Sequence, residues 1–587
     1  MKIEYKKAAS GALLLVSFFY FSCKKSGVSS NTGGGGGNNP PPVDSTYNPT
    51  DPSVAASIGF FGKAWKPKTF TIPDGIAGTV PTNAPTDSLT INVNKVLVKV
   101  PPYVYGNNSN LWTGQTVTQP ALMQYLTDLS PNIIRGPGGS ISDVYFWNGT
   151  DANPAPSNVP AKLLNADGTL GGTNWWWYGG NTASWTFSLD NYYNLLAQTN
   201  STGIITVNYG YARYGTSANP VATAAHLAAD WVRHDNGRTK FWEIGNENFG
   251  NWEAGYNIDQ SKNQDGQPPI ITGAVYGAHV KVFADSMRAA AQETGATIYI
   301  GAVIYQEAPA TYDNNTVKTW NLGVLQNAGS TADFFIVHNY FTAYATNSSV
   351  NDILSTGNTV PANVMSYVTQ QLTASGVGLK PIAFTEWNIQ ATGSKQEVSF
   401  IAGIHAAKTI GSIIKNNFGE ASRWDIANGY NNGDDMGMFN DGDEPGAPLW
   451  NPRPAFFYLY YFQKFFGDRM VYDTLKAANT DITTYSSTFT SGQAGTVIIN
   501  SGSLSHIVAI DFQHFPAGSK YYWYLLTGGT DNPPFSGQVY VNGTGPATAT
   551  GGPLAYATLK AYSAPLNGTI KISVPPLSVI YLVADKK

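Results

Sequence analysis

The chain of 587 residues has few charged side chains and almost no cysteine. Its single cysteine, Cys23, excludes any disulfide bond within the chain. Only 12% of the residues are charged and the net charge is −4, so there is no basic excess to bind the phosphates of nucleic acid. The sequence also lacks zinc-ligand spacing, a phosphate-binding glycine loop and the spacing of an EF-hand. We therefore expect no nucleic-acid partner, no metal and no cofactor.

Aromatic and small residues are abundant by contrast. Tyr, Phe and Trp together make up 13% of the chain, which also contains 61 glycines. A surface that is polar mainly through uncharged groups and rich in aromatic rings suits neutral sugars, because the C–H faces of sugars stack on such rings. The composition favours a carbohydrate partner without establishing one.

The first 22 residues have the pattern of a secretion signal. Three lysines within the first seven residues precede an apolar run over 11–21, which is too short to span a bilayer. Cys23 follows directly, and its position resembles the acylated cysteine of bacterial lipoproteins; an ordinary cleaved signal with an incidental cysteine is the alternative. We expect a secreted protein anchored through Cys23 to a membrane, in the periplasm or at the cell surface.

A flexible linker and a short β segment are expected next. Residues 23–57 are rich in Gly, Asn, Ser and Pro and have no apolar periodicity, which is typical of a tether. Strands are predicted at 65–72 and 88–94, where apolar and polar residues alternate. We assign the whole segment 58–94 to a sheet that the C-terminal part of the chain completes.

Residues 95–468 predict a (β/α)8 TIM barrel, because short apolar strands alternate with helical patterns. Several strands are apolar at consecutive positions, as strands buried on both faces must be. Three or four strand–helix units alone would fit a doubly wound sheet, whereas the eight units of this segment fit the barrel better. Helices are expected over 119–129, from 219–220 onward, over 276–291 and over 456–466. The predicted strands are 96–105, 132–135, 203–209, 240–246, 297–303, 334–341, 381–387 and 423–427.

The C-terminal residues 469–587 predict an all-β sandwich. Short apolar segments recur there between turns rich in Gly, Asn, Ser and Pro, and no helical periodicity remains. The predicted strands are 482–490, 496–500, 506–512, 520–526, 538–541, 570–574 and 578–584.

Two glutamates stand where the active site of such a barrel is expected. Active sites of TIM barrels lie at the C-terminal ends of the strands. The fourth strand runs into Gly-Asn-Glu, which ends at Glu247, and the seventh ends at Glu386 followed by Trp387. Strands four and seven lie on opposite sides of the barrel, so the two carboxyl groups face each other across its mouth. Glycoside cleavage requires two carboxyl groups that flank one bond.

These segments resemble glycoside hydrolases of clan A. WEIGNE at 242–247 and TEWN at 385–388 look like the clan signature, and RGPGG at 135–139, ITVNYG at 205–210, AAHLAADWV at 224–232 and HNY at 338–340 are most similar to family 51 α-L-arabinofuranosidases and their relatives. The resemblance implies a retaining mechanism with Glu247 as acid/base and Glu386 as nucleophile.

The resemblance also implies substrate-binding residues. Asn246 would bind the sugar 2-hydroxyl, Arg135 would keep the nucleophile ionised and Tyr340 would donate to it. His338, Trp387 and Asn107 are further candidates for the substrate site.

Two positions depart from the family 51 pattern. Thr385 stands where that family usually has Asp, and VYGNNSNLW at 104–112 replaces the first-strand motif and its glutamate. We predict a retaining glycoside hydrolase of extracellular polysaccharide or oligosaccharide, most like an α-L-arabinofuranosidase. Other clan A activities remain open, of the β-glucuronidase, β-xylosidase or endoglucanase type. The rival from another class is a surface lipoprotein that binds glycans without cleaving them.

Overall fold

The computed structural model describes residues 47–430, 436–477 and 480–587. The predicted signal, Cys23 and most of the predicted tether lie outside the described residues. Residues 47–57 of that tether are packed against the folded chain, since Asp51 forms an ion pair with Arg469 at 2.6 Å. None of the helices in the described part of the chain combines the length and the apolar character needed to cross a lipid bilayer.

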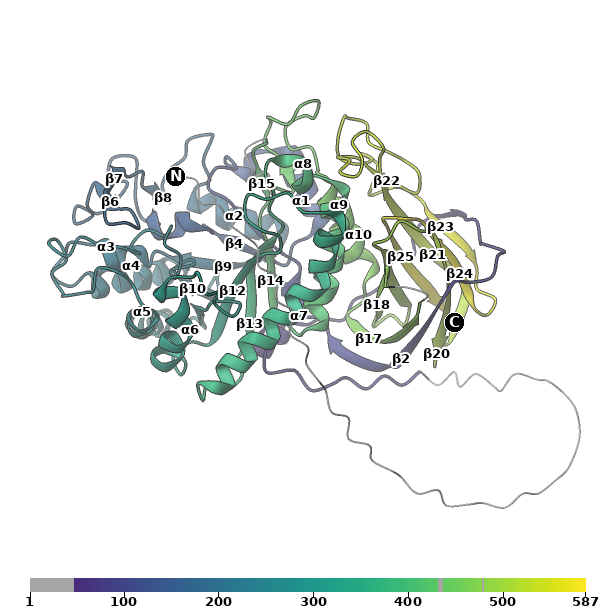
Figure 1. Ribbon diagram of the computed structural model, residues 1–587, viewed down its shortest axis with the longest axis horizontal. Coiled ribbons are helices and arrows are strands. Elements are labelled where there is room, and N and C mark those ends of the chain that lie inside the picture. Colours follow the sequence, from purple (N-terminus) through teal and green to yellow (C-terminus); the bar gives the residue numbers. More distant parts are fainter. Residues whose placement is uncertain (1–46, 431–435, 478–479) are drawn as a thin grey trace, which may run out of the picture. The chain divides into compact units, whose positions relative to one another are not determined.

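Eight parallel strands close into a barrel, as the sequence predicts, and Figure 1 shows helices around them. Residues of these strands are buried at consecutive positions, because the barrel interior covers one face and the helices cover the other. In chain order the barrel strands are β3 (Gly106–Asn108), β4 (Ile133–Gly136), β9 (Thr202–Val207), β10 (Phe241–Ile244), β11 (Tyr299–Val303), β12 (Phe334–Tyr340), β13 (Ile382–Asn388) and β14 (Glu420–Arg423).

Several helices begin after a Ser, Thr or Asn residue whose side chain caps them. Asn219 accepts a hydrogen bond from the backbone of Ala222, and Pro220 occupies the first turn of α4, as predicted. The helices are α1 (Pro120–Leu129), α2 (Leu189–Thr199), α3 (Gly210–Tyr214), α4 (Pro220–Asp235), α5 (Gly273–Thr294), α6 (Asn315–Ala328), α7 (Val350–Ala374), α8 (Ser394–Glu397), α9 (Phe400–Lys415) and α10 (Pro454–Phe465).

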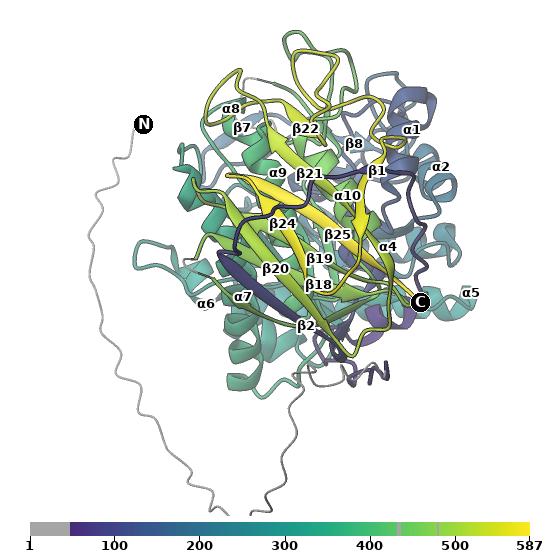
Figure 2. The ribbon, with the colours of Figure 1, turned by 90° about the vertical axis from the view of Figure 1, so that its right-hand side faces the viewer.

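The C-terminal part forms one mixed sheet of eleven strands, several of which run side by side in Figure 2. The sheet curls, so that residues from most of its strands meet in a single apolar cluster. Its strands are β1 (Gly75–Ala77), β2 (Asp87–Lys99), β17 (Arg469–Lys476), β18 (Ile482–Thr488), β19 (Ala494–Asn500), β20 (His506–Gln513), β21 (Ala517–Gly528), β22 (Val539–Val541), β23 (Ala561–Pro565), β24 (Ile570–Val574) and β25 (Ser578–Lys586).

The sheet packs on the barrel through β25 and α10. Alternate residues of β25 face opposite ways: Ile580 and Leu582 enter the sheet's own apolar cluster, while Tyr581 and Val583 enter that of the barrel. The Tyr581 hydroxyl donates to the backbone oxygen of Tyr458 in α10 at 2.7 Å. Barrel and sheet therefore share a continuous interior.

Three predicted strands are wrong in detail. Residues 65–72 form no strand; the 3-10 helix Gly59–Ala64 precedes them. Residues 96–99 belong to β2 in the sheet, where burial alternates as in a strand with one buried face, and the first barrel strand is β3. The eighth strand is β14, earlier than 423–427. Three sheet strands, β1, β17 and β23, are missing from the prediction.

Short strands lie in the loops that follow the C-terminal ends of two barrel strands. They are β5 (Tyr145–Phe146), β6 (Lys162–Leu164), β7 (Leu170–Thr173) and β8 (Trp177–Tyr178) after β4, and β15 (Ala427–Asn428) and β16 (Phe439–Asn440) after β14. Residues 431–435, between β15 and β16, lie outside the described part of the chain.

Candidate active site

Glu247 and Glu386 meet at the mouth of the barrel. Glu386 lies within β13, and Glu247 follows β10 in a turn where both Gly245 and Glu247 have positive φ, +73° and +40°. One carboxylate oxygen of each glutamate lies within 4.8 Å of the other. The predicted meeting of these two side chains is therefore present, with their oxygens facing each other.

Glu386 is held by two donors. Arg135 Nη1 donates to Oε1 at 2.8 Å, and the Tyr340 hydroxyl donates to Oε2 at 2.9 Å. Burial, together with the charges of Glu386 and Glu247, raises the pKa of Tyr340 well above its usual range, so its hydroxyl stays protonated. The Glu386 side chain is only 5% exposed. These contacts orient the carboxylate and place a positive charge beside it, which suits a nucleophile.

Arg135 connects this carboxylate to its surroundings. The guanidinium is fully buried and donates to Glu243 Oε2 at 2.6 Å, to Asn108 Oδ1 at 3.1 Å and to Asn246 Oδ1 at 2.9 Å. Burial opposes its charge, but Glu243 and Glu386 outweigh that effect and raise the pKa of Arg135. A permanent positive charge thus lies beside the proposed nucleophile.

Glu247 has different neighbours. His338 Nδ1 lies 2.9 Å from Oε1, and Trp252 Nε1 donates to Oε2 at 3.3 Å. The other ring nitrogen of His338 lies 2.9 Å from the Thr385 hydroxyl, so both nitrogens of the imidazole have a partner. The Glu247 side chain is 17% exposed, more than that of Glu386, and among the described residues its ion-pair partner is His338 rather than an arginine. Exposure at the mouth suits a group that exchanges protons with water.

Asn246 is fixed through both atoms of its amide. Its oxygen accepts from Arg135, and its nitrogen donates to Glu253 Oε1 at 2.9 Å, which also accepts from the Ser140 hydroxyl at 2.7 Å. Burial, assisted by the charges of Asp143 and Glu247, raises the pKa of Glu253 well above its usual range. We infer that Glu253 is protonated near neutral pH.

Asp143 supports the same turn. It accepts from the backbone of Gly210 at 2.8 Å and from Asn248 Nδ2 at 2.6 Å. Burial raises its pKa to about 7, against the effect of these donors. Asp143 thereby ties the turn that carries Glu247 to the segment that follows β9.

Trp387 and Asn107 lie in the barrel wall. Trp387 is 1% exposed and Asn107 4%, and the side chains of both keep one polar atom, Nε1 and Oδ1, without a partner among the described residues. Their predicted contact with substrate stays a prediction.

Sequence reasoning missed several side chains of this site, among them Asn108, Asp143, Glu243, Trp252 and Glu253. Glu243 lies inside the predicted strand 240–246, where its polarity amid apolar neighbours was the available signal, and Asn108 follows the predicted strand 96–105. Glu253 and Trp252 lie in the loop after the fourth strand, and no pattern in that loop distinguishes them.

The carboxylates also resemble a metal site in one respect. One ligand atom each from Glu247, His338 and Glu386 lies within 4.8 Å of the other two. However, both oxygens of Glu386 already accept from protein donors, and one donor is the cation Arg135. A guanidinium in this position disfavours a second cation, so the arrangement fits acid–base and nucleophilic chemistry better.

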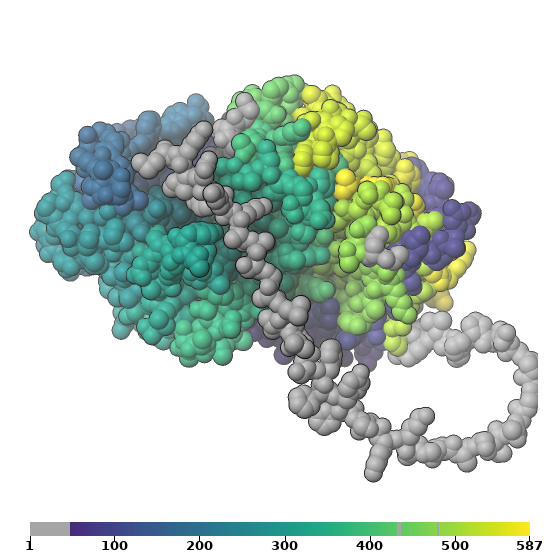
Figure 3. All heavy atoms as spheres, viewed as in Figure 1, coloured from purple at the N-terminus to yellow at the C-terminus, as the bar shows by residue number. Residues whose placement is uncertain are grey.

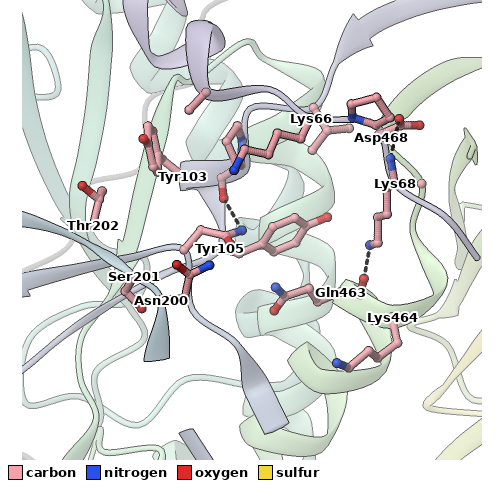
Figure 4. Close-up of a pocket in the computed structure, with 16 residues that line it drawn as sticks. Lys66, Lys68, Tyr103, Tyr105, Asn200, Ser201, Thr202, Gln463, Lys464 and Asp468 are labelled. Atoms are coloured by element: carbon pink, nitrogen blue, oxygen red, sulfur yellow. Dashed lines mark hydrogen bonds between the residues drawn. The ribbon is translucent and has the colours of Figure 1, made fainter. Parts of the chain in front are cut away.

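A cavity of about 470 Å³ lies elsewhere, and Figure 4 shows the side chains that line it. It includes Tyr105, Asn132 and Thr202, which stand at or before the first residues of barrel strands, so it lies at the end opposite to the glutamates. Lys68, on its wall, donates to the backbone oxygens of Gln463 and Phe466 at the end of α10. Residues at this end of a TIM barrel support the fold rather than the chemistry.

Comparison with solved structures gives the fold. An α-L-arabinofuranosidase from Thermotoga maritima, in complex with arabinose, matches with a TM-score of 0.59 and 15% identity over 85% of this chain and all of that chain. A family 51 α-L-arabinofuranosidase from Bifidobacterium longum gives 0.59 and 16% over 86% and 100%. A family 44 xyloglucanase from Paenibacillus polymyxa gives 0.54 and 12% over 86% and 100%.

No family model matches the sequence, and no curated protein matches it either. At such low identity the structural likeness establishes the shared architecture, a TIM barrel joined to a β-rich domain. It confirms the predicted fold class, and it agrees with the resemblance to clan A that the sequence motifs indicate.

Proposed function

We propose that the protein is a retaining glycoside hydrolase. The observation that supports this most strongly is the pair Glu247 and Glu386, whose oxygens lie within 4.8 Å of each other at the catalytic end of the barrel. Carboxyl groups about 5–5.5 Å apart act by double displacement, whereas an inverting pair needs about 6.5–9.5 Å to admit a water molecule. The observed separation favours retention.

The contacts of each glutamate assign its role. Glu386, ionised beside Arg135 and oriented by Tyr340, attacks the anomeric carbon and forms a covalent glycosyl-enzyme. Glu247 donates its proton to the oxygen of the departing group as the glycosidic bond breaks. In the second step Glu247 takes a proton from water, whose oxygen attacks the anomeric carbon and releases Glu386. Both carboxyl groups return to their starting states.

The proposed sugar specificity rests on the solved structures of similar fold. Arabinofuranosidases are prominent among the solved structures of similar fold, and xyloglucanase, glucanase-xylanase and glucuronidase structures occur beside them. We infer that an α-L-arabinofuranoside is the first substrate to test, with β-xyloside, β-glucoside and β-glucuronide as the alternatives.

Turnover of fluorogenic glycosides tests the enzyme assignment. We expect the wild type to hydrolyse at least one glycoside of this panel, and Glu386→Gln to reduce kcat by more than about 1,000-fold, because the amide cannot form the covalent intermediate. Glu293→Gln is the matched control, since Glu293 is an exposed glutamate near the C-terminal end of α5 and its carboxylate accepts from Arg233 on α4. Unchanged turnover in Glu386→Gln, or no turnover by the wild type, contradicts the proposal. The second result favours the non-catalytic glycan-binding lipoprotein.

We also propose that the enzyme acts outside the cytoplasm on a lipid anchor at Cys23. The basic and apolar segments before this cysteine support the proposal. Expression of the full chain in a bacterial host should place it in the membrane fraction, and Cys23→Ala should move it to the soluble fraction. Equal partitioning of both forms contradicts the anchor.

A further inference from the structure

Two exposed tryptophans and one partly buried tryptophan form an aromatic cluster on the side of the barrel where the strands end. Trp175 is 64% exposed and Trp185 46%, and their ring centroids lie 5.9 Å apart, edge to face. Trp177 packs against Trp185 in the same way at 5.8 Å. We call Trp175, Trp177 and Trp185 the tryptophan rim. All three belong to the segment between β4 and α2, whose residues are blue in Figures 1 and 3.

The local backbone explains why neighbouring tryptophans in this segment differ in exposure. Trp177 begins β8, which pairs with β5. Trp176 packs inward, with its ring 5.5 Å from both Phe146 and Tyr214. The residue one position before it on an extended chain faces the other side, so Trp175 lies on the surface. Trp177 is partly buried, and it packs against the barrel core as well as against Trp185.

The tryptophan rim is joined to the active site through the loop between β3 and α1. Gln115 Nε2 in that loop donates to the backbone oxygens of Asn181 and Ala183, at 3.2 Å and 3.1 Å, in the segment that leads to Trp185. The same loop carries Trp112, whose ring lies 6.2 Å from that of Trp424.

Trp424 brings this connection to the nucleophile. Its backbone nitrogen donates to the oxygen of Trp387 at 3.2 Å, and Trp387 follows Glu386 directly. A chain of contacts therefore leads from Trp387, which follows Glu386, through Trp424 and the loop that carries Trp112 to the segment before Trp185. The exposed residues before Trp185, at 182–184, are Thr, Ala and Ser, which are uncharged.

We propose that the tryptophan rim binds a neutral glycan chain whose cleaved bond lies at Glu247 and Glu386. The proposal rests on the glycosidase assignment and extends it: the substrate is an oligosaccharide or polysaccharide with several units bound, rather than a single terminal sugar. Flat aromatic faces bind the C–H faces of sugars and require no charge, which matches this surface. Large exposed apolar groups at a rim are typical of a binding surface.

Affinity electrophoresis tests the binding step without relying on catalysis. The Glu386→Gln protein is run through gels containing arabinan, arabinoxylan, xyloglucan or mixed-linkage β-glucan, with and without Trp175→Ala/Trp185→Ala. We expect at least one glycan to retard the protein and the double substitution to raise its dissociation constant about tenfold or more. Tyr472→Ala is the control, because Tyr472 is an exposed aromatic on β17, in the C-terminal sheet.

Kinetics distinguish failure of this inference from failure of the proposed function. With active enzyme, the double substitution should lower kcat/KM about tenfold on the polymer and leave kcat/KM on a small aryl glycoside unchanged. Equal losses on both substrates, unaltered retardation, or no retardation by any of the four glycans overturns the rim as a glycan site. A change in oligomeric mass caused by the double substitution also overturns it, since the rim would then join copies of the chain. Retardation without turnover by the wild type refutes the enzyme and supports the rim.

Discussion

At the residue scale, the site depends on one buried cation and the groups it orients. Arg135 contacts Glu386, Glu243, Asn246 and Asn108, so a single guanidinium positions the proposed nucleophile and the amide beside the acid/base. Four hydrogen bonds from one planar group leave these side chains little freedom to rotate. Preorganised charge of this kind lowers a barrier because it needs no rearrangement during the reaction.

Glu253 provides a prediction at this scale. Because its raised pKa keeps it neutral, Glu253→Gln should retain kcat/KM within about threefold, since the amide oxygen accepts from Ser140 and Asn246 as before. Glu253→Ala leaves the Asn246 amide buried without an acceptor, which costs about 1–3 kcal/mol, and we expect kcat/KM to fall about 10–100-fold. Steady-state kinetics of the two variants check this. A larger loss in Gln than in Ala would show that Glu253 acts as a carboxylate.

The same group makes stability depend on pH. An unfolded Glu titrates near 4.5, and the folded pKa of Glu253 is higher, so the stability it contributes is present below pH 4.5 and is lost as the pH rises through the folded value. We expect the Tm of Glu253→Gln to increase relative to that of the wild type as the pH rises from 4 toward 8. Parallel thermal curves across that range would contradict a neutral Glu253.

At the element scale, the turn after β4 packs against Trp424, whose backbone nitrogen donates to the oxygen of Trp387 beside Glu386. Gly139 has φ +63°, and a Cβ added there would lie 2.6 Å from Cη2 of Trp424, closer than packed carbon atoms approach. Gly138 and Gly139 thus make room for the ring of Trp424, which follows β14 and so lies two strands from β4 in the closed barrel.

Gly139→Ala should therefore displace Trp424. We expect kcat/KM on an aryl glycoside to fall at least about tenfold and stability to fall by about 1–3 kcal/mol, measured by kinetics and by denaturant unfolding. Gly172→Ala is the matched control, since nothing lies within 4 Å of its added Cβ. Equal kcat/KM and equal stability of the two variants would contradict a role for Trp424 in the site.

Much at this scale is readable from sequence, and the failures have physical reasons. Runs such as FFIV at 334–337 and IAF at 382–384 are apolar at consecutive positions, and only strands buried on both faces need that pattern. β3 and β14 contain the polar residues Asn107, Asn108 and Arg423 in buried positions, and the side chains of Asn108 and Arg423 donate to backbone oxygens, so periodicity misplaces these strands. The contacts of Arg135 depend on side chains from four strands, which no local pattern predicts.

At the scale of the whole molecule, the C-terminal sheet and the N-terminal segment pack on the outside of the barrel and stabilise it. Lys68 precedes β2, and its ammonium group donates to the last backbone oxygens of α10. Such donors complement the negative end of a helix. Burial lowers the pKa of Lys68 to about 7. The buried ammonium group therefore loses its proton as the pH rises through about 7, and its effect on the free energy of unfolding depends on pH.

Lys68 therefore gives a prediction about the assembled fold. Between pH 7 and 10.5 the unfolded lysine binds a proton that the folded one has released, so stability from this group rises with pH. We expect the Tm of the wild type to rise relative to Lys68→Met as the pH increases from 7 to 10. A Tm difference between the wild type and Lys68→Met that stays constant with pH would contradict burial of the Lys68 ammonium group.

The central claim, that Glu247 and Glu386 cleave glycosides by double displacement, is tested most directly by the configuration of the first product. Proton NMR, recorded within minutes of adding enzyme to an aryl glycoside, identifies the anomer before mutarotation equilibrates it. The separation of the two carboxyl groups predicts that the released sugar has the configuration of the substrate. Release of the opposite anomer would contradict the account.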